Sequence, residues 1–279
     1  MELAPVNPSD LIPVTGVYSH LITLPMVAGY EGVGRVVEAH GAHAALIGSR
    51  VLPLRGPGTW QRYVDCDPAL AVPVPDDIED LRAARGYINP LAALRMLTRY
   101  PVAGKRVLLT VSGSSCATLL GHWALLQGAV EVVGVYRSSE RVARMRTLGI
   151  VPVSGEDAGA IEAAARAADV TFDAVGGDLG SKVLAAMRMG SVFVGYDLLS
   201  GQPVVPPAIL RAGFERFHLR DDLAEMTPAV WQVQFDRLWP LLRQVEFPEV
   251  QVFVLEDWKA AIRAFREAGG AKPLIDFRS

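Results

Sequence analysis

Cysteine is scarce in this chain of 279 residues, which contains only Cys66 and Cys116. Two thiols cannot build a disulfide framework or a cysteine-rich zinc lobe, so the reducing cytoplasm is the expected compartment. Long apolar runs are also missing, because the hydrophobic stretches are of strand length or are interrupted by Gly and Pro, and we therefore expect no membrane span. The first residues lack the basic start and the apolar core of a signal peptide.

An excess of basic charge is absent as well. The 27 Lys and Arg residues are scattered among 30 Asp and Glu, which gives a net charge of −3. This balance argues against nucleic acid as a partner. With 51% hydrophobic and 20% charged residues, the composition is that of an ordinary globular protein with room for two domains.

What the sequence does contain is a βαβ pattern. A β-rich stretch, Val107–Val111, leads into the small-residue turn Ser112–Ala117. An apolar, helix-like run continues to Gln127, and a second β-rich stretch, Glu131–Tyr136, follows. At such a turn, backbone N–H groups and the N-terminus of the helix face one spot, which suits a pyrophosphate.

Two of the three glycines typical of a dinucleotide-binding turn are missing. The corresponding small residues in this turn are Gly113, Ser115 and Ala117. If one of these positions requires φ > 0, a Ser or Ala there costs on the order of 1 kcal/mol, which weakens the site without abolishing it. A βαβ unit that binds nothing is the alternative interpretation of this stretch.

An acid is also missing at the end of the second strand. NAD-specific sites place a carboxylate there to hold the ribose 2′-hydroxyl, whereas NADP sites leave room and positive charge for the 2′-phosphate. This strand ends in Tyr136-Arg137-Ser138-Ser139, and Glu140 falls in the first turn of the next helix. The guanidinium of Arg137 and the two serine hydroxyls favour NADPH as the cofactor.

Residues 1–85 are rich in proline and turn residues, and they predict a compact, barrel-like β domain without long helices. The expected strands are Gly32–Ala39, Arg50–Leu54 and Thr59–Asp65. A helix is expected over Arg82–Leu97, and Asn89-Pro90 must end or kink it.

Beyond the first βαβ unit, helices alternate with short Val-rich strands. The expected helices are Arg141–Leu148, Gly159–Ala167 and Leu179–Met187, and the expected strands are Val151–Val153, Val170–Val175 and Ser191–Gly195. Such alternation predicts an α/β fold with a doubly wound parallel sheet covered on both faces. Towards the C-terminus we expect an edge strand at Phe217–Arg220, a helix at Trp231–Val245, a strand at Val250–Leu255, a helix at Asp257–Glu267 with Asp257 as its N-cap, and a strand at Leu274–Phe277.

An ordered set of short motifs runs through nearly the whole chain. They are Asn7-Pro-Ser-Asp10, Tyr18, Leu24-Pro25, Gly29-Tyr-Glu-Gly-Val-Gly34, Gly58-Thr-Trp60, Asn89-Pro90 with Arg95-Met-Leu97, Val175-Gly-Gly177, Gly201-Gln-Pro-Val204 and Lys272. In this order they resemble the zinc-free medium-chain dehydrogenases/reductases, and within them the mitochondrial-type 2-enoyl thioester reductases (trans-2-enoyl-CoA/ACP reductases) and the quinone oxidoreductases.

The resemblance implies two domains. Residues 1–85 and 223–279 would form a GroES-like catalytic domain, and residues 86–222 a Rossmann dinucleotide-binding domain. The chain begins where relatives have an internal strand, so the first β-hairpin of the GroES-like domain is expected to be missing. The resemblance also implies a homodimer that joins two sheets through the edge strand near Phe217–Arg220.

No metal site is expected. Zinc-dependent members carry a Cys near the Asn7–Asp10 segment and a His in the position of Tyr30, so an imidazole–thiolate site cannot be built here. His40 and His43 lie three residues apart in a Gly/Ala loop without a third ligand, and two histidines in solvent are the simpler interpretation.

The resemblance implies hydride transfer from NADPH to Cβ of an α,β-unsaturated thioester, with a tyrosine that donates the proton to Cα. Tyr18 matches that tyrosine in its spacing from the motifs before and after it, and a phenol is neutral at pH 7 and can donate a proton. A tyrosine packed on a loop is the alternative. The family pattern of cofactor contacts falls on Asn89, Gly113, Ser114, Ser115, Cys116, Arg137, Ser138, Ser139, Tyr196, Asp197, Leu198, Leu199 and Lys272.

One departure from the family concerns the substrate. Relatives have an apolar, aromatic segment after the last strand of the sheet, whereas this chain has His218-Leu-Arg-Asp-Asp222. Polar and charged groups line a fatty-acyl tunnel only at a cost in free energy, which indicates a short or polar substrate, a subunit edge, or lost activity.

Three functions therefore stay open. The first is NADPH-dependent reduction of an enoyl thioester or enone. The second is NADPH:quinone reduction, which uses the same fold and cofactor and does not require Tyr18. The third is a non-catalytic dinucleotide-binding or scaffold protein whose site has decayed.

Overall fold

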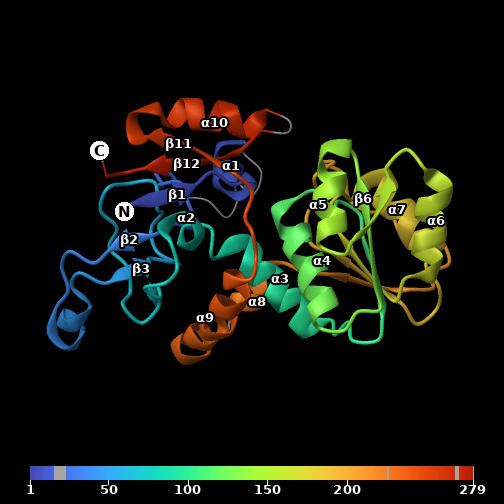
Figure 1. The fold of residues 1–279 in the computed structure, drawn as a ribbon, viewed down its shortest axis with the longest axis horizontal. Coiled ribbons are helices and arrows are strands. Elements are labelled where there is room, and N and C mark those ends of the chain that lie inside the picture. Colours follow the sequence, from blue (N-terminus) through green and yellow to red (C-terminus); the bar gives the residue numbers. More distant parts are fainter. Residues whose placement is uncertain (16–22, 225, 268–269, 279) are drawn as a thin grey trace. The chain divides into compact units, whose positions relative to one another are not determined.

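The computed structural model describes residues 1–15, 23–224, 226–267 and 270–278 (Figure 1). The chain divides into two compact units. Unit 1 consists of Met1–Leu91 and Met226–Ser279, and unit 2 of Ala92–Glu225. Helix α3, Ile88–Arg99, contains the first boundary between them. Among the helices of the described residues, none is long and apolar enough to cross a membrane.

A six-stranded parallel sheet forms the centre of unit 2. Its strands are β5 (Arg106–Leu109), β6 (Glu131–Tyr136), β7 (Val151–Ser154), β8 (Val170–Asp173), β9 (Val192–Gly195) and β10 (Gly213–Arg216). They lie in the order β10-β9-β8-β5-β6-β7. The strand order therefore reverses between β5 and β8. In a doubly wound sheet, ligands bind at the carboxyl ends of the strands beside such a switch point.

Helices cover both faces of this sheet, as the alternating pattern predicts. They are α4 (Ser115–Leu126), α5 (Val142–Thr147, after the 3₁₀ turn Ser139–Arg141), α6 (Ala158–Ala167) and α7 (Gly177–Ala186), and the short α8 (Leu219–Leu223) follows β10. In Figure 1, α4 and α5 lie on one side of β6, and α6 and α7 on the other. Right-handed crossovers produce this arrangement when the strand order reverses. The predicted α/β class, with a doubly wound parallel sheet, is confirmed.

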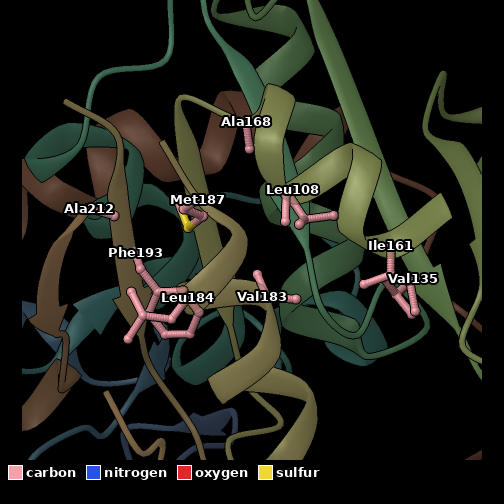
Figure 2. Packing of buried hydrophobic residues seen from close by; sticks show 10 residues of the cluster. Leu108, Val135, Ile161, Ala168, Val183, Leu184, Met187, Phe193 and Ala212 are labelled. Atoms are coloured by element: carbon pink, nitrogen blue, oxygen red, sulfur yellow. The ribbon is translucent and has the colours of Figure 1, made fainter. Parts of the chain in front are cut away.

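Apolar side chains fill the layer between this sheet and helices α6 and α7 (Figure 2). Leu108 and Phe193 come from the sheet, and Ile161, Val183 and Leu184 come from the helices. All five are buried, and full burial of a side chain of this size stabilises the folded state by roughly 1.5–3 kcal/mol. This layer therefore fixes the strands whose carboxyl ends meet at the switch point.

Two glycines outside the fingerprint positions let α4 and the turn before it pack closely on the sheet. A Cβ on Gly134 of β6 would lie 2.5 Å from the Cβ of Ser112. A Cβ on Gly121 of α4 would lie 2.7 Å from Cδ1 of Ile150. Both distances are shorter than real carbon–carbon contacts, so the close approach of helix and strand depends on these glycines rather than on the position of Ala117.

Within the described residues, unit 1 contains two three-stranded sheets. The first sheet has the strand order β1-β12-β11 and consists of β1 (Leu3–Pro5), β12 (Lys272–Asp276) and β11 (Val250–Val254). The second sheet has the strand order β2-β3-β4 and consists of β2 (Gly34–Arg35), β3 (Arg50–Leu52) and β4 (Val72–Pro73). The helices are α1 (Pro8–Thr15), α2 (Asp80–Ala83), α9 (Pro228–Arg243) and α10 (Trp258–Arg266), with 3₁₀ turns at Gly41–Leu46 and Leu255–Asp257. Because β1 pairs with β12, the first and last strands of the chain share one sheet.

The β structure of residues 1–85 is sparser than predicted. The strand expected at Gly32–Ala39 is reduced to β2, and no strand forms at Thr59–Asp65. There the N–H of Thr59 bonds to the carbonyl of Gly29 at 3.0 Å, which joins two loops. Such isolated pairing is set by tertiary contacts, so the local residue pattern does not reveal it.

Two predicted elements near the domain boundaries are wrong. Asn89-Pro90 begins helix α3 instead of ending a helix, and the predicted helix Arg82–Leu97 is thereby divided into α2 and α3. Proline suits the first turn because the N–H that it lacks has no intrahelical partner there. The edge strand is β10, and not Phe217–Arg220, which instead leads into helix α8.

Candidate functional site

The turn between β5 and α4 leaves backbone N–H groups without a partner inside the helix. Ser114 is the N-cap of α4, and its side chain accepts a hydrogen bond from the N–H of Ala117 at 3.2 Å. Ser115 and Cys116 are the first two helical residues, and N–H groups at these positions have no partner within a helix. They can therefore bind an anion at the positive end of the helix dipole.

The glycine replacements in this turn cause no backbone strain. Neither Gly113 nor Ser115 nor Ala117 has a positive φ angle; among described residues other than glycine, only Arg55 has one. The expected penalty of about 1 kcal/mol for Ser or Ala is therefore not incurred, since it applies only to the left-handed region. Gly113 still matters for space, because a Cβ there would lie 3.3 Å from Cγ of Arg141.

Two arginines lie beyond the carboxyl end of β6. Arg137, Ser138 and Ser139 are exposed directly after the strand, and Arg141 is half-buried at the N-cap of α5, with its Cγ next to Gly113. Neither guanidinium has an ion-pair or hydrogen-bond partner among the residues that the structure describes. Arg141 was not among the predicted cofactor residues, although a second basic residue four positions after Arg137 is a signal that could have identified it.

Asp173 organises the other side of the switch point. It ends β8, is fully buried, and accepts hydrogen bonds from the Thr110 hydroxyl at 2.5 Å and from the N–H of Gly176 at 2.9 Å. Burial raises the pKa of this carboxyl, although these bonds oppose the shift. Gly176 has φ of 67°, and a Cβ there would lie 2.4 Å from the carbonyl oxygen of Gln202, so the loop requires glycine. The Val175–Gly177 motif indicated this loop, but nothing in the sequence indicated Asp173.

The loop after β9 packs against the β5–α4 turn. The Tyr196 phenol lies close enough to the Ser114 hydroxyl for the two to interact, and the Tyr196 N–H bonds to the carbonyl of Asp173 at 2.8 Å. Burial raises the pKa of the Tyr196 phenol well above its usual value of 10. Burial, together with the Asp197 carboxylate, also raises the pKa of the Cys116 thiol to about 12, so this thiol is unreactive near neutral pH. Four of the predicted cofactor residues are thus neighbours.

The remaining residues of the predicted cofactor set have different surroundings. Leu198 and Leu199 are exposed at 45% and 53% in the loop after β9. Asn89 and Lys272 belong to unit 1, where Asn89 lies in the first turn of α3 and the Lys272 ammonium donates to Asn7 Oδ1. Tyr18, the predicted catalytic residue, lies outside the described residues.

The positions that hold zinc ligands in zinc-dependent relatives are used differently here. The Asn7 side chain donates to Glu31 Oε1 at 2.8 Å and accepts from Lys272, and the Tyr30 N–H donates to Asp10. His40 lies 3.3 Å from the Glu38 carboxylate on the surface. Among the residues that the structure describes, no three His, Cys, Asp or Glu side chains are grouped so that they could hold a metal ion.

Three comparisons with known proteins agree on the family. Residues 1–76 match the alcohol dehydrogenase GroES-like domain. The mitochondrial enoyl-[acyl-carrier-protein] reductase of Xenopus tropicalis is 31% identical over 223 residues, and its human counterpart is 28% identical over 284 residues. The crystal structure of a candidate NADPH:quinone reductase from Bacillus thuringiensis is 33% identical, with a TM-score of 0.92 over 99% of this chain and 88% of that chain. The chain belongs to the zinc-free medium-chain dehydrogenase/reductase superfamily.

The matches to enzymes of this superfamily differ in extent. The Xenopus alignment covers 74% of this chain but 63% of that reductase, so the chain spans less than two thirds of its length. The human alignment covers 95% of this chain and 76% of the reductase. That the chain belongs to this superfamily confirms the predicted family resemblance. It also confirms the predicted combination of a GroES-like region with a Rossmann sheet.

The polar segment that departs from other superfamily members is largely paired within unit 2. Asp222 of α8 accepts from Nε of Arg95 at 2.6 Å, and both side chains are mostly buried. His218 Nδ1 lies 3.3 Å from Asp221 Oδ1. Part of the charge in this segment therefore serves to attach α8 to α3, which the sequence analysis did not anticipate.

Proposed function

We propose that this protein is an NADPH-dependent oxidoreductase that reduces the activated C=C bond of an enoyl thioester or enone. The observation that carries the proposal is the switch point between β5 and β8, where the β5–α4 turn, Asp173 and the loop after β9 meet. This is where a doubly wound sheet binds a dinucleotide. Family membership supports hydride transfer as the reaction.

The donor set at this edge fits NADPH. The N–H groups of Ser115 and Cys116 suit the pyrophosphate, and Arg137, Arg141 and the two serines suit the 2′-phosphate. An arginine pair without carboxylate partners among the described residues favours a phosphate over a bare ribose hydroxyl. When bound, the nicotinamide supplies the hydride. Asn89, Lys272 and the loop Tyr196–Leu199 would complete the contacts.

The proton for Cα would come from Tyr18. Its place in the sequence relative to the Asn7–Asp10 and Leu24-Pro25 motifs supports this role. A neutral phenol at pH 7 can donate its proton as the hydride reaches Cβ. Protonation in step with hydride transfer prevents an enolate from accumulating.

Tyr18→Phe tests the reaction type. In an enoyl reductase, the variant should reduce crotonyl thioester or enone substrates about 100-fold more slowly than the wild type, because the proton donor is lost. Tyr63→Phe, at a side chain that is 75% exposed, is the matched control and should leave the rate unchanged. Stopped-flow measurement of NADPH oxidation gives both rates.

Quinone reduction is the second candidate function. The similarity to the Bacillus thuringiensis protein and the polar segment His218–Asp222 favour it over a long acyl substrate. In that case Tyr18→Phe should leave NADPH:quinone turnover nearly unchanged. Absence of turnover with thioesters, enones and quinones, in a protein that binds NADPH, would instead support the non-catalytic dinucleotide-binding alternative.

The domain roles and the assembly are part of the same proposal. Residues 86–222 would serve as the dinucleotide-binding domain, and residues 1–85 with 223–279 as the catalytic domain. Two copies would pair through β10, whose four residues are all exposed. The exposed apolar side chains of Val205 and Ile209, on the segment that leads to β10, support such a contact. The cytoplasmic location stays a prediction.

A further inference from the structure

Unit 1 contains a cluster of buried polar side chains for which the proposed chemistry has no direct use. Asn7, Asp10 and Glu31 are each at most 2% exposed. The Lys272 ammonium joins them by its hydrogen bond to Asn7. Burying charges costs free energy unless each charge is paired and hydrogen-bonded. The hydrogen bonds within this cluster must therefore offset that cost.

Glu31 caps the helix that carries Asn89. Its Oε2 accepts hydrogen bonds from the N–H groups of Tyr87 at 3.1 Å and Ile88 at 2.7 Å. Ile88 is the first residue of α3, and Asn89 is the second. A carboxylate at this end also interacts favourably with the helix dipole. Glu31 thus fixes the backbone immediately before Asn89.

The other carboxylate oxygen of Glu31 is connected to Lys272 through the side-chain amide of Asn7. Oε1 accepts from Asn7 Nδ2 at 2.8 Å, and Asn7 Oδ1 in turn accepts from the Lys272 ammonium. The opposite charges of Glu31 and Lys272 attract each other across this amide. The amide therefore has one orientation, with its NH₂ on the carboxylate and its oxygen on the ammonium.

Asp10 holds the loop that presents Glu31. Its two oxygens accept from the N–H of Asn7 at 2.7 Å and from the N–H of Tyr30 at 2.9 Å. Asn7 and Tyr30, on either side of the cluster, are thus bound to one carboxylate. Glu31 follows Tyr30 directly, so its backbone position is set by this pair of bonds.

We propose that Glu31 is a positioning residue of the nucleotide site, which orients Asn89 through the start of α3 and Lys272 through Asn7. The inference rests on the proposed function, because it takes Asn89 and Lys272 as nucleotide contacts. A carboxylate is required at this position, since all three groups that face it are N–H donors. A carboxamide would present its own NH₂ to at least one of them.

Glu31→Gln is the test, with amide hydrogen exchange and nucleotide affinity measured on the same protein. Exchange at Tyr87 and Ile88 should accelerate tenfold or more, and the Kd for NADPH should rise about tenfold, while kcat at saturating NADPH stays near the wild-type value. Asp80→Asn is the matched control, because it breaks a partly buried ion pair with Arg50 in the same unit and should change neither quantity. In a Lys272→Met background, Glu31→Gln should weaken NADPH binding by much less than it does alone.

The possible results separate this inference from the proposed function. If the wild type binds no NADPH, the proposed function fails. The amide hydrogen exchange rates of Tyr87 and Ile88 still show in that case whether Glu31 stabilises the start of α3. If the wild type binds NADPH and Glu31→Gln binds it equally well, the positioning role is overturned. Asn7→Ala is the substitute test variant if Glu31→Gln does not fold. It should weaken NADPH binding without accelerating exchange at Tyr87 and Ile88, and unchanged affinity would again overturn the inference.

Discussion

Single carboxylates at buried positions fix loops in each of the two units. Asp173 holds the loop after β8, while Asp10 and Glu31 hold the segments around Asn7 and the start of α3. Each accepts two or more N–H bonds, which compensates in part for the loss of solvent. None of these three carboxylates is proposed to contact the cofactor, yet they fix the backbone next to residues that are.

Asp10 should make the stability of the protein depend on pH. Burial raises its pKa from 3.8 to about 7, with the neighbouring Glu31 adding to the rise and the bonds from Asn7 and Tyr30 opposing it. The folded state then keeps a proton that the unfolded state has released between these values, so the contribution of Asp10 is fully present below about pH 4 and is lost as the pH rises to 7. Asp10→Asn should therefore flatten the decline of the denaturation midpoint between pH 5 and pH 7. A variant as steep as the wild type would show that another group, such as Glu31, holds the proton.

At the scale of residues, the sequence indicates those candidate positions that lie within one local motif. Arg137 and the serines after it follow directly from the end of a predicted strand, and the N-cap at Ser114 lies in the predicted turn. Arg141 and Asp173 were missed because their roles depend on a contact with Gly113 and on a bond to Thr110, which come from other elements. The expected glycine penalty was wrong because it presumed left-handed backbone angles that the turn does not use.

At the scale of elements, the parallel strands of unit 2 were predictable, and the loops and short strands of unit 1 were not. Buried parallel strands form continuous apolar runs, and β5 illustrates this with the buried residues Val107, Leu108 and Leu109. In unit 1, β2 and β4 are two residues long and depend on pairing with β3, so no local pattern marks them. The edge strand was displaced in the prediction because Phe217, which is buried, lies just beyond β10.

The free side of β10 should mediate the proposed homodimer. The N–H groups of Gly213 and Phe217 bond to the carbonyls of Ser191, just before β9, and of Gly195 in β9, so by alternation the N–H groups of Phe214 and Arg216 face the outer edge of the sheet. Arg216→Pro removes one outward donor without removing a bond to β9, and we expect it to shift a dimer to the monomer mass in light scattering. Arg216→Ala is the control and should leave the dimer intact. A folded proline variant that keeps the dimer mass would exclude pairing through this edge.

For the whole molecule, the order of the elements was more informative than any one motif. The glycine fingerprint is incomplete, yet the strand order β10-β9-β8-β5-β6-β7 and the series of short motifs both point to the same superfamily. The order of elements along the chain reflects the burial pattern of every strand and helix, and single substitutions in one turn do not alter it. What this level does not determine is the substrate, since one fold serves several reductases.

Titration of the protein with NADPH and NADH, followed by fluorescence or calorimetry, tests the central claim most directly. We expect the wild type to bind NADPH at least tenfold more tightly than NADH. Arg137→Ala and Arg141→Ala should each weaken NADPH binding about tenfold, a loss of about 1.4 kcal/mol, and leave NADH binding unchanged. Arg166→Ala, which removes an arginine paired with Glu162 on α6, is the control and should have no effect. Failure to bind either nucleotide, or equal affinity for both in all four proteins, would contradict the account.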